Sequence, residues 1–304
     1  MKCVAIDFET ANAKRSSVCA VGIALVEGKE IVQRSSWLVR PPELDFDPYN
    51  IYIHGITEDD VRDKPEFNQL WDELRVYLQE RTVLAHYASF DMSVLRHVLD
   101  EYGIAYPQLE YLCTRAIAKC TWPKLLSYGL VTVSEHLGIE FRHHDPEEDA
   151  AACAEVALRS CGDVGVASLE ELTEKLRITT GRLYPGGYRP SGAKAIRPGE
   201  IQPTTDKFDP NHPFFEKTVV FTGTLQSMVR RDAMQRVVDS GGRCANSISK
   251  AVSYLVLGDQ DFSRLSGAEK SSKLRMAESL IANGVDLEFI PEAEFLEMLE
   301  GDKG

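Results

Sequence analysis

The chain has 304 residues, 43% of them hydrophobic, which allows one large core or two smaller ones, and the length favours two domains. No stretch approaches the roughly 18 uninterrupted apolar residues of a membrane-spanning helix, so we expect no membrane partner. The formal net charge of −13 argues against a broad, nonspecific nucleic-acid-binding surface, although it is compatible with a local basic groove. The seven cysteines contain no C-x-x-C pair, which is typical of reduced thiols, and we expect a cytoplasmic protein.

An α/β pattern extends over residues 1–165. Alternating and continuous apolar runs predict strands in KCVAIDFE, CAVGIALVEG, QRSSWLVRP and TVLAHY. Apolar residues at helical spacing predict helices in FNQLWDELRVYLQE, DMSVLRHVLDEYG, VTVSEHLG and EEDAAACAEVALRSC. Strands followed by a strand–helix alternation indicate an α/β layer with a mixed sheet.

Residues 166–211 are predicted to connect this domain to a second one. A short amphipathic helix, SLEELTEKLR, precedes a stretch rich in Gly and Pro that has no helical or strand periodicity. This linker carries Arg182, Arg189, Lys194 and Arg197. A solvated connector is the favoured interpretation, and a tether that touches nucleic acid is the alternative.

A second α/β pattern occupies residues 212–304. The strands predicted there are KTVVFTG, RCANSI, SYLVLG and VDLEFI, and the helices are RRDAMQRVVDSGG, SSKLRMAESLIANG and PEAEFLEMLEG. Four strands separated by helices or loops in under a hundred residues indicate a small parallel sheet.

Four acids and one histidine form the candidate catalytic set. Asp7 and Glu9 lie two positions apart in a strand, so they face the same side and repel each other unless they are solvated or share a cation. Asp91 and Asp149 open helices, where a capping role or an interaction with the helix dipole is the alternative, and His144 lies five residues before Asp149. Hard divalent cations prefer such oxygen ligands, whereas zinc is disfavoured because thiolates and clustered imidazoles are lacking.

The motifs DFET, AHYASFD and HHDPEEDA resemble, in order and spacing, those of the DEDDh exonuclease family, to which the proofreading epsilon subunit of bacterial DNA polymerase III belongs. The resemblance covers about the first 165 residues and implies a ribonuclease-H-like fold with a mixed sheet. It implies that Asp7, Glu9, Asp91 and Asp149 hold two Mg²⁺ or Mn²⁺ ions. His144 is then the general base that takes a proton from the water attacking the 3′-terminal phosphodiester.

The same resemblance suggests residues that bind the terminal nucleotide. The segment IHGIT resembles one that lines the nucleotide pocket, so His54 is either a substrate contact or a turn residue, and Thr10 also lies where the family contacts the nucleotide. Tyr87 is a departure, because the family often has Asn there. Its ring either stacks on a base or fills space.

VVFTGTL and SGGRCANSISKAVSYLVLG resemble a BRCT domain over about 90 residues. By this resemblance Thr222, Gly223, Arg230 and Lys273 form a phosphate pocket, since the strand end and the following helix start favour an anion. Phe295 replaces a common Trp, which should change the packing but not the fold. Phosphopeptide binding and protein docking are the alternatives.

These observations together predict a metal-dependent 3′→5′ exonuclease acting on single-stranded or frayed DNA 3′ ends in replication or repair. The BRCT module would recruit it to a DNA 5′-phosphate or to a repair or replication protein, and its tether would raise the local concentration of the enzyme near DNA. The alternatives are an exonuclease that acts on RNA and a noncatalytic BRCT adaptor that binds DNA ends.

Overall fold

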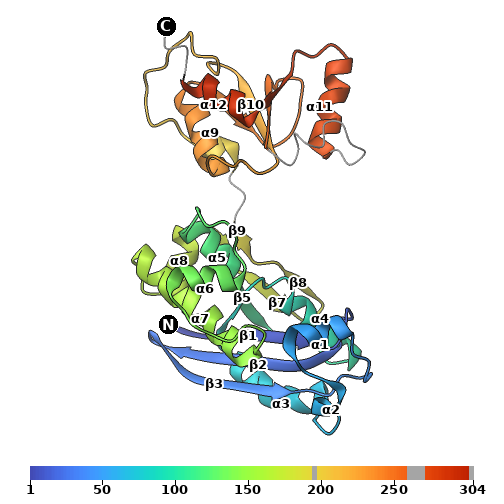
Figure 1. The fold of residues 1–304 in the computed structure, drawn as a ribbon. Coiled ribbons are helices and arrows are strands. Elements are labelled where there is room, and N and C mark those ends of the chain that lie inside the picture. Colours follow the sequence, from blue (N-terminus) through green and yellow to red (C-terminus); the bar gives the residue numbers. More distant parts are fainter. Residues whose placement is uncertain (194–196, 259–270, 301–304) are drawn as a thin grey trace. The chain divides into compact units, whose positions relative to one another are not determined.

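The computed structural model describes residues 1–193, 197–258 and 271–300. The chain divides into two compact units, Met1–Lys194 and Ala195–Gly304 (Figure 1). Each unit has its own sheet and its own apolar core. The prediction of two α/β domains is therefore confirmed.

The first unit is built around a mixed sheet. Its strands are β1 (Lys2–Thr10), β2 (Val18–Glu27), β3 (Glu30–Leu38), β4 (Thr82–Ala85), β5 (Leu109–Cys113), β7 (Gly181–Tyr184) and β8 (Gly187–Arg189). In space the order is β3-β2-β1-β4-β5-β7-β8. The first three strands are antiparallel, whereas β4 and β5 run parallel to β1, so the sheet is mixed, as the sequence predicts. The strand β5 itself is not among the predicted strands.

Helices cover both faces of this sheet (Figure 1). They are α1 (Pro48–His54), α2 (Glu58–Val61), α3 (Phe67–Leu78), α4 (Asp91–Glu101), α5 (Thr114–Thr121), α6 (Leu130–Leu137), α7 (Pro146–Val164) and α8 (Leu169–Lys175). Val4, Ile6 and Phe8 of β1 pack with α3 and α4, whereas Cys3 and Ala5 pack with α7 on the opposite face. Because side chains alternate along a strand, the odd-numbered residues that follow also face the α7 side.

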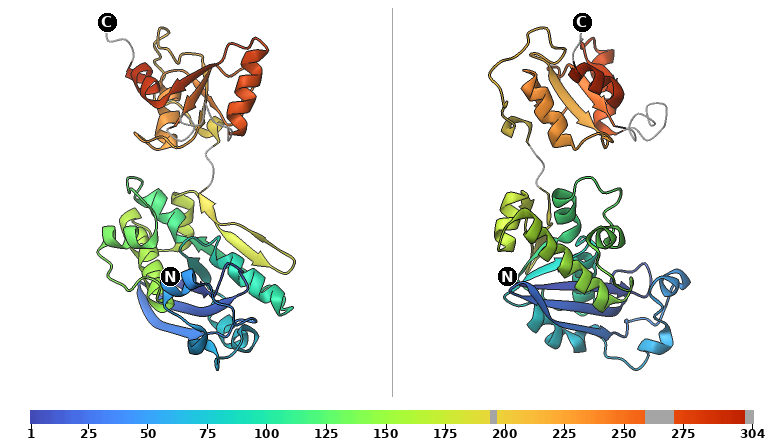
Figure 2. Two further views of the ribbon diagram at one scale, coloured as in Figure 1. Left: turned by 45° about the vertical axis from the view of Figure 1, so that its right-hand side comes forward. Right: turned by 60° about the vertical axis from the view of Figure 1, so that its left-hand side comes forward.

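The predicted linker is wrong for residues 178–193, which form strands. β7 pairs antiparallel with β5, and β8 pairs with β7, so a hairpin extends the main sheet (Figure 2). Gly186 has φ 85°, as the third residue of a type II turn requires, and Pro185 precedes it. A Cβ at Gly181 would lie 2.4 Å from the Tyr111 ring. In this segment Pro185 and Gly186 form a tight turn, and Gly181 allows a close contact with Tyr111. The first unit therefore extends well beyond residue 165.

The same hairpin accounts for part of the basic character of this segment. Arg182 Nη2 lies 2.8 Å from Glu110 Oε1 on the neighbouring strand, and the carbonyl of Arg189 accepts a hydrogen bond from the Tyr111 hydroxyl. These two arginines therefore belong to the sheet. Lys194 lies outside the described residues. Two further short strands, β6 (Ile178–Thr179) and β9 (Gly192–Ala193), pair with each other.

The second unit contains a parallel sheet in the order β11-β10-β12-β13, as predicted. Its elements are η1 (Pro198–Glu200), β10 (Thr218–Thr222), α9 (Arg230–Asp239), β11 (Arg243–Ala245), β12 (Tyr254–Leu257), α11 (Ser272–Ala282), β13 (Glu288–Pro291) and α12 (Glu292–Glu300). Phe295 of α12 is fully buried, and its ring centroid lies 5.4 Å from that of Phe214 and 5.3 Å from that of Phe221. A phenylalanine thus fills this position within an intact core.

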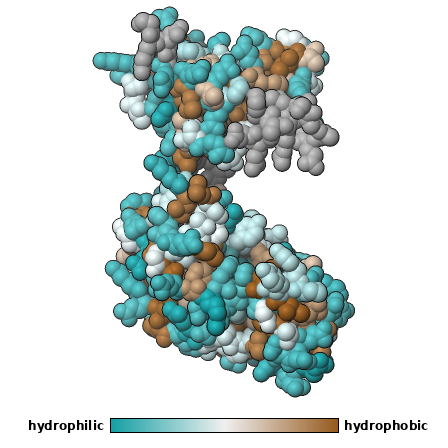
Figure 3. All heavy atoms as spheres, viewed as in Figure 1, coloured by the Kyte–Doolittle hydropathy of each residue, from teal (hydrophilic) through white to brown (hydrophobic). Residues whose placement is uncertain are grey.

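The face of the molecule seen in Figure 3 is mainly polar. Figure 3 shows hydrophilic residues over much of the visible face of each unit. In the part of the chain that the structure describes, none of the helices combines the length and apolar character needed to cross a membrane. All seven cysteines are free thiols, and five of them are buried.

Candidate active site

Asp7 and Glu9 lie on the face of β1 that is turned toward α7. Asp7 pairs with Gly22 on the adjacent strand β2. A Cβ at Gly22 would lie 1.9 Å from the carbonyl oxygen of Pro146, the first residue of α7. The glycine therefore lets the start of α7 pack directly on the sheet beside the two acids.

Asp91 and Asp149 reach the same region from the starts of two helices. Asp91 is the first residue of α4 and is 1% exposed, and Asp149 in the first turn of α7 is 3% exposed. Neither is the N-cap of its helix. Phe90 occupies that position in α4, and Asp145 caps α7 by accepting two backbone N–H groups. The capping alternative for both acids is therefore wrong.

The carboxylates converge. Oxygen atoms of Asp7, Glu9 and Asp149 lie within 4.8 Å of one another. Burial raises the pKa of Glu9 to about 8, and repulsion from Asp149 and Asp91 adds to the rise. Burial also raises the pKa of Asp91 to about 8, and burial with repulsion from Asp91 raises that of Asp7 well above its usual value. So many buried acids are unfavourable as anions unless a cation balances them.

Two of these oxygens have no protein partner. Asp7 Oδ2 and Asp91 Oδ1 are buried and accept no hydrogen bond from any residue that the structure describes. Buried polar atoms normally have partners, because an unsatisfied one costs free energy. Divalent cations such as Mg²⁺ bind carboxylate oxygens. The unpartnered oxygens and the converging acids therefore fit a divalent-cation site.

His144 lies beside these acids. Its Nδ1 atom is 3.8 Å from Glu9 Oε1, and its backbone N–H donates to Asp149 Oδ2 at 3.0 Å. Its φ of 67° is in the left-handed region, which a residue with a Cβ adopts at a cost. Burial and the neighbouring His143 lower the pKa of His144, so the ring is neutral near pH 7 and can accept a proton.

His143 is a site residue that is not among the candidates named from the sequence. Its Nδ1 atom lies 3.1 Å from both carboxylate oxygens of Asp149, and its ring stacks on His144 with centroids 3.8 Å apart. It therefore orients both the acid and the neighbouring imidazole. The available signal was the His-His pair directly before the capping residue of α7.

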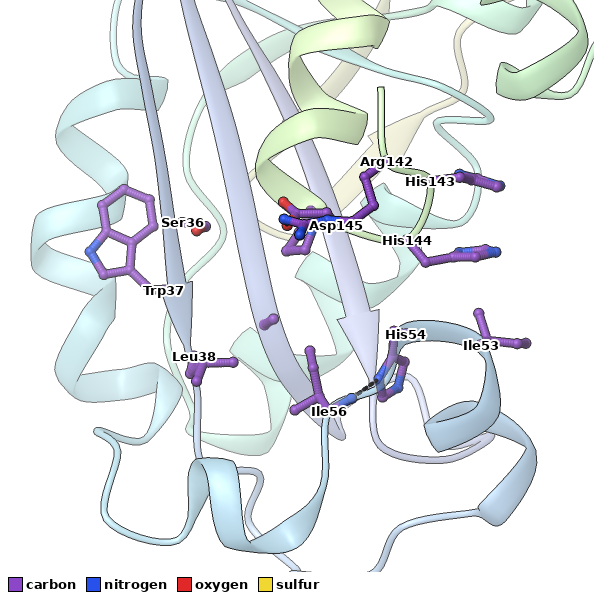
Figure 4. Close-up of a pocket in the computed structure, with 12 residues that line it drawn as sticks. Ser36, Trp37, Leu38, Ile53, His54, Ile56, Arg142, His143, His144 and Asp145 are labelled. Carbon is purple, nitrogen blue, oxygen red and sulfur yellow. Dashed lines mark hydrogen bonds and ion pairs between the residues drawn. The ribbon is translucent and has the colours of Figure 1, made fainter. Parts of the chain in front are cut away.

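A cavity of about 460 Å³ adjoins the histidines, lined by residues from β3, from α1 and the turn after it, and from the loop before α7 (Figure 4). His54 lines it, while His54 Nδ1 accepts the Ile56 N–H at 3.0 Å and Nε2 lies 3.3 Å from the Thr10 carbonyl. Burial lowers the pKa of His54, so the ring is neutral. His54 thus connects the turn after α1 to the end of β1, and Thr10 is 5% exposed behind it.

The predicted phosphate residues of the second unit also come together. Arg230 donates to the carbonyls of Phe221 and Gly223, and Lys273 Nζ donates to the Phe221 carbonyl at 2.9 Å. Thr222, which is 5% exposed, lies between Phe221 and Gly223 at the end of β10. Two cations from the starts of α9 and α11 therefore meet at the carboxyl end of this strand.

Comparison with known families identifies both units. A model described as "Exonuclease" matches residues 4–157, half of the chain, and a model of the BRCA1 C Terminus (BRCT) domain matches residues 210–282. The chain belongs to the exonuclease family. Its first unit is an exonuclease domain of the DEDDh type, a hydrolase fold whose family depends on divalent metals, and its second unit is a BRCT domain. Both predicted resemblances are confirmed.

Curated relatives of this exonuclease are much longer proteins. The chain is 31% identical over 182 residues to the DNA polymerase III PolC-type of Thermotoga maritima, covering 58% of this chain and 13% of the relative. It is 31% identical over 183 residues to a DNA ligase of Geobacter metallireducens, covering 59% and 24%. It is 25% identical over 156 residues to the 3′-5′ exonuclease DinG of Staphylococcus aureus, covering 50% and 17%. This chain thus covers less than a quarter of the length of each of these relatives.

Solved structures similar to this exonuclease include two nucleases. Exonuclease X in complex with 5′ overhanging duplex DNA has 25% identity and a TM-score of 0.46, with 57% of this chain and 99% of the other covered. The nuclease domain of 3′hExo, a DEDDh family member bound to rAMP, has 19% identity and a TM-score of 0.48, with 53% and 92% covered.

Proposed function

We propose that the protein is a metal-dependent 3′→5′ exonuclease that hydrolyses terminal phosphodiesters at single-stranded or frayed DNA 3′ ends during replication or repair. The convergence of Asp7, Glu9 and Asp149, with Asp91 close enough for its charge to act on Asp7 and Glu9, carries this proposal together with two buried oxygens that lack protein partners. The names of the relatives support it, since they include a 3′-5′ exonuclease, a DNA polymerase and a DNA ligase.

In this proposal the four carboxylates hold two Mg²⁺ or Mn²⁺ ions. Bound there, such ions stabilise charge on the attacking and leaving oxygens of a phosphoryl displacement. The protein contributes fixed ligand positions, because Asp7 and Glu9 come from one strand within the sheet. Asp91 and Asp149 come from the first turns of α4 and α7, so packing of those helices against the sheet decides whether the site is assembled.

His144 is proposed as the general base. It is neutral at pH 7 because its pKa is lowered by burial and then by His143, and its Nδ1 atom lies 3.8 Å from Glu9 Oε1. It would take the proton of the attacking water, while His143 holds the ring by stacking. Thr10 and His54 are proposed to bind the terminal nucleotide, since the His54 ring lines the cavity and is tied to the Thr10 carbonyl.

We further propose that the BRCT domain recruits the enzyme by binding a DNA 5′-phosphate or a replication or repair protein. Arg230 and Lys273 bring positive charge to the end of β10, where Thr222 and Gly223 supply a hydroxyl and a backbone N–H. Charge-assisted hydrogen bonds of this kind suit a phosphate. The four residues are therefore the ones to test for anion binding.

The deciding experiment uses the full chain with 5′-labelled single-stranded DNA and RNA oligomers of one sequence, in Mg²⁺ or in EDTA. We expect a DNA ladder that shortens from the 3′ end in Mg²⁺ and is absent in EDTA. A higher rate on RNA would instead make the protein an exoribonuclease. No cleavage of either oligomer, with tight binding to 5′-phosphorylated duplex ends, would make it an adaptor.

Asp7→Asn separates loss of the site from loss of the fold. Asparagine keeps the shape of the side chain and removes its negative charge. Burial and repulsion from Asp91 raise the pKa of Asp7, which means that this charge is unfavourable in the metal-free fold. The metal-free variant should therefore not lose thermal stability. Cleavage should be abolished. Asp72→Asn on α3 is the matched control, because that side chain is 81% exposed and the same substitution there should leave cleavage unchanged. Normal cleavage by Asp7→Asn would refute the metal assignment.

A further inference from the structure

Two loops and a helix start lie at the same edge of the main sheet as the carboxylates. β1, β4 and β5 are parallel neighbours, so the segments that follow their carboxyl ends meet at one edge. These segments carry Arg15 after β1, Tyr87 and Phe90 after β4, and Arg115 after β5. The hydrogen-bond contact of His86 Nδ1 with Thr114 Oγ1 at 3.0 Å shows that the last two segments touch.

Tyr87 is held in a conformation that its own backbone does not favour. Its φ is 68°, in the left-handed region, where a bulky residue with a Cβ is strained. The residue is 54% exposed, and the Arg115 guanidinium lies 4.9 Å from its ring centroid. A side chain that only filled space would be covered by the core. This ring instead lies at the surface with a cation over one face.

A second arginine–aromatic pair involves Phe90, which is partly buried against the core of the first unit. The Arg15 guanidinium is 4.2 Å from the centroid of the Phe90 ring, and Phe90 directly precedes Asp91. Arg15 is also close enough to Asp91 for its charge to oppose the rise in the pKa of that carboxyl, which burial causes. Both arginine–aromatic pairs therefore border the carboxylate site.

The charges of these two arginines are available to a ligand. Within residues 1–193, 197–258 and 271–300, neither Arg15 nor Arg115 has an ion pair with a carboxylate within 4.0 Å. The chain as a whole has a net charge of −13. Two guanidinium groups that lack a close ion pair and lie beside a cluster of acids are suited to a phosphate backbone that must approach those acids.

We infer that Tyr87, Arg115, Phe90 and Arg15, here termed the aromatic–arginine rim, bind the unpaired strand that leads into the active site. Unpaired bases stack on an exposed aromatic ring regardless of sequence, and the arginines contact phosphates. Bases inside a duplex are already stacked and paired, so the rim selects single-stranded 3′ ends. This inference rests on the proposed function and names the residues that would select the unpaired strand.

The rim is tested in the full chain by comparing substitutions at two tyrosines on two substrates. A labelled single-stranded DNA oligonucleotide would reach both the rim and the carboxylates, whereas the p-nitrophenyl ester of thymidine 5′-phosphate would reach the carboxylates alone. Tyr87→Asn is the test variant, since Asn tolerates a positive φ and should fold at least as well. Tyr188→Asn is the matched control, because Arg96 lies 3.9 Å from the Tyr188 ring centroid on a strand distant from β1.

We expect Tyr87→Asn to raise KM for the oligonucleotide by about tenfold, the size of one lost stacking contact, and to leave ester hydrolysis within about twofold. Tyr87→Phe should restore oligonucleotide binding, and Tyr188→Asn should match the wild type. Arg115→Gln should reduce the slope of log KM against log salt concentration by about 0.7.

Unchanged oligonucleotide kinetics in Tyr87→Asn would overturn the inference, and so would an equal loss on both substrates. If the wild-type chain hydrolyses neither substrate, the proposed function fails on its own account. Fluorescence anisotropy with the labelled oligonucleotide then decides the rim separately. A Kd that rises about tenfold in Tyr87→Asn would support it, and an unchanged Kd would reject it.

Discussion

Replacing Gly22 by alanine tests whether the packing of α7 on the sheet assembles the active site. Gly22 lies opposite Asp7 in the β1–β2 pair, and the start of α7 contacts it. That helix carries Asp149 in its first turn, and His144 lies just before it. A methyl group at residue 22 would therefore push Asp149 and His144 away from the two acids on β1.

The size of the effect follows from three distances. The new Cβ would lie 1.9 Å from the Pro146 carbonyl oxygen, 2.1 Å from its carbonyl carbon and 2.5 Å from the Glu147 nitrogen. Since non-bonded heavy atoms sit about 3.5 Å apart, these backbone atoms must retreat by roughly 1–1.5 Å. Overpacking of this kind costs about 1–3 kcal/mol of unfolding free energy. A displacement of about 1 Å at a catalytic site lowers turnover on the order of 100-fold.

The assay pairs urea unfolding with initial rates on single-stranded DNA in Mg²⁺. Gly162→Ala is the matched control, because Gly162 lies in the same helix, a Cβ there meets nothing within 4 Å, and alanine is the better helix former by about 1 kcal/mol. We expect that control to gain stability and keep its turnover. Wild-type turnover in a folded Gly22→Ala protein would refute the argument that this contact positions Asp149 and His144.

Three further experiments address the charges of the two units. Because the pKa values of Glu9 and Asp91 are raised to about 8, their protonation stabilises the metal-free fold fully below about pH 4, and this contribution is lost as the pH rises through 8. The melting temperature without metal should therefore fall as the pH rises from 5 to 8. Mg²⁺ should raise the melting temperature more at pH 8 than at pH 5. An equal rise at both pH values would contradict this. His144→Asn should lower kcat by about 10²–10⁴-fold with little change in KM. His143→Asn should mainly raise the Mg²⁺ concentration needed for half-maximal rate. The reverse pattern would show that the two histidines have each other's roles. Lys273→Gln should weaken anisotropy-measured binding of 5′-phosphorylated duplex DNA but not of the 5′-hydroxyl form, and equal binding of both forms by the wild type would remove the phosphate assignment.

Features that depend on local spacing were predictable from the sequence. The alternation along β1 places Asp7 and Glu9 on one face, and the structure confirms that this face meets α7. Helices with apolar residues at regular spacing, such as α3 and α7, also form as predicted. The BRCT strands are equally local in origin, because each is a short apolar run between turn residues. Period and turn chemistry suffice where one element buries one face.

The hairpin of residues 178–193 could not be found this way. Its glycines and prolines have the same composition as a flexible connector, and β7 gains its stability from pairing with β5, which lies about 70 residues earlier in the chain. Strand formation at a sheet edge depends on the partner rather than on intrinsic propensity. Glycine is needed at residue 181 because a Cβ there would collide with the Tyr111 ring. No local sequence pattern predicts that contact.

The histidine pair shows the same limit within the site. Sequence spacing selects His144 through its distance from Asp149, yet His143 contacts Asp149 more closely, at 3.1 Å from both oxygens. The difference arises from the φ of 67° at His144, which turns the backbone so that its N–H reaches Asp149 while the two rings stack. A backbone angle of that kind depends on the surrounding structure, not on the motif itself. Spacing therefore identifies the segment that carries the site residues. The packing of α7 on Gly22 determines how His143, His144 and Asp149 are placed relative to one another.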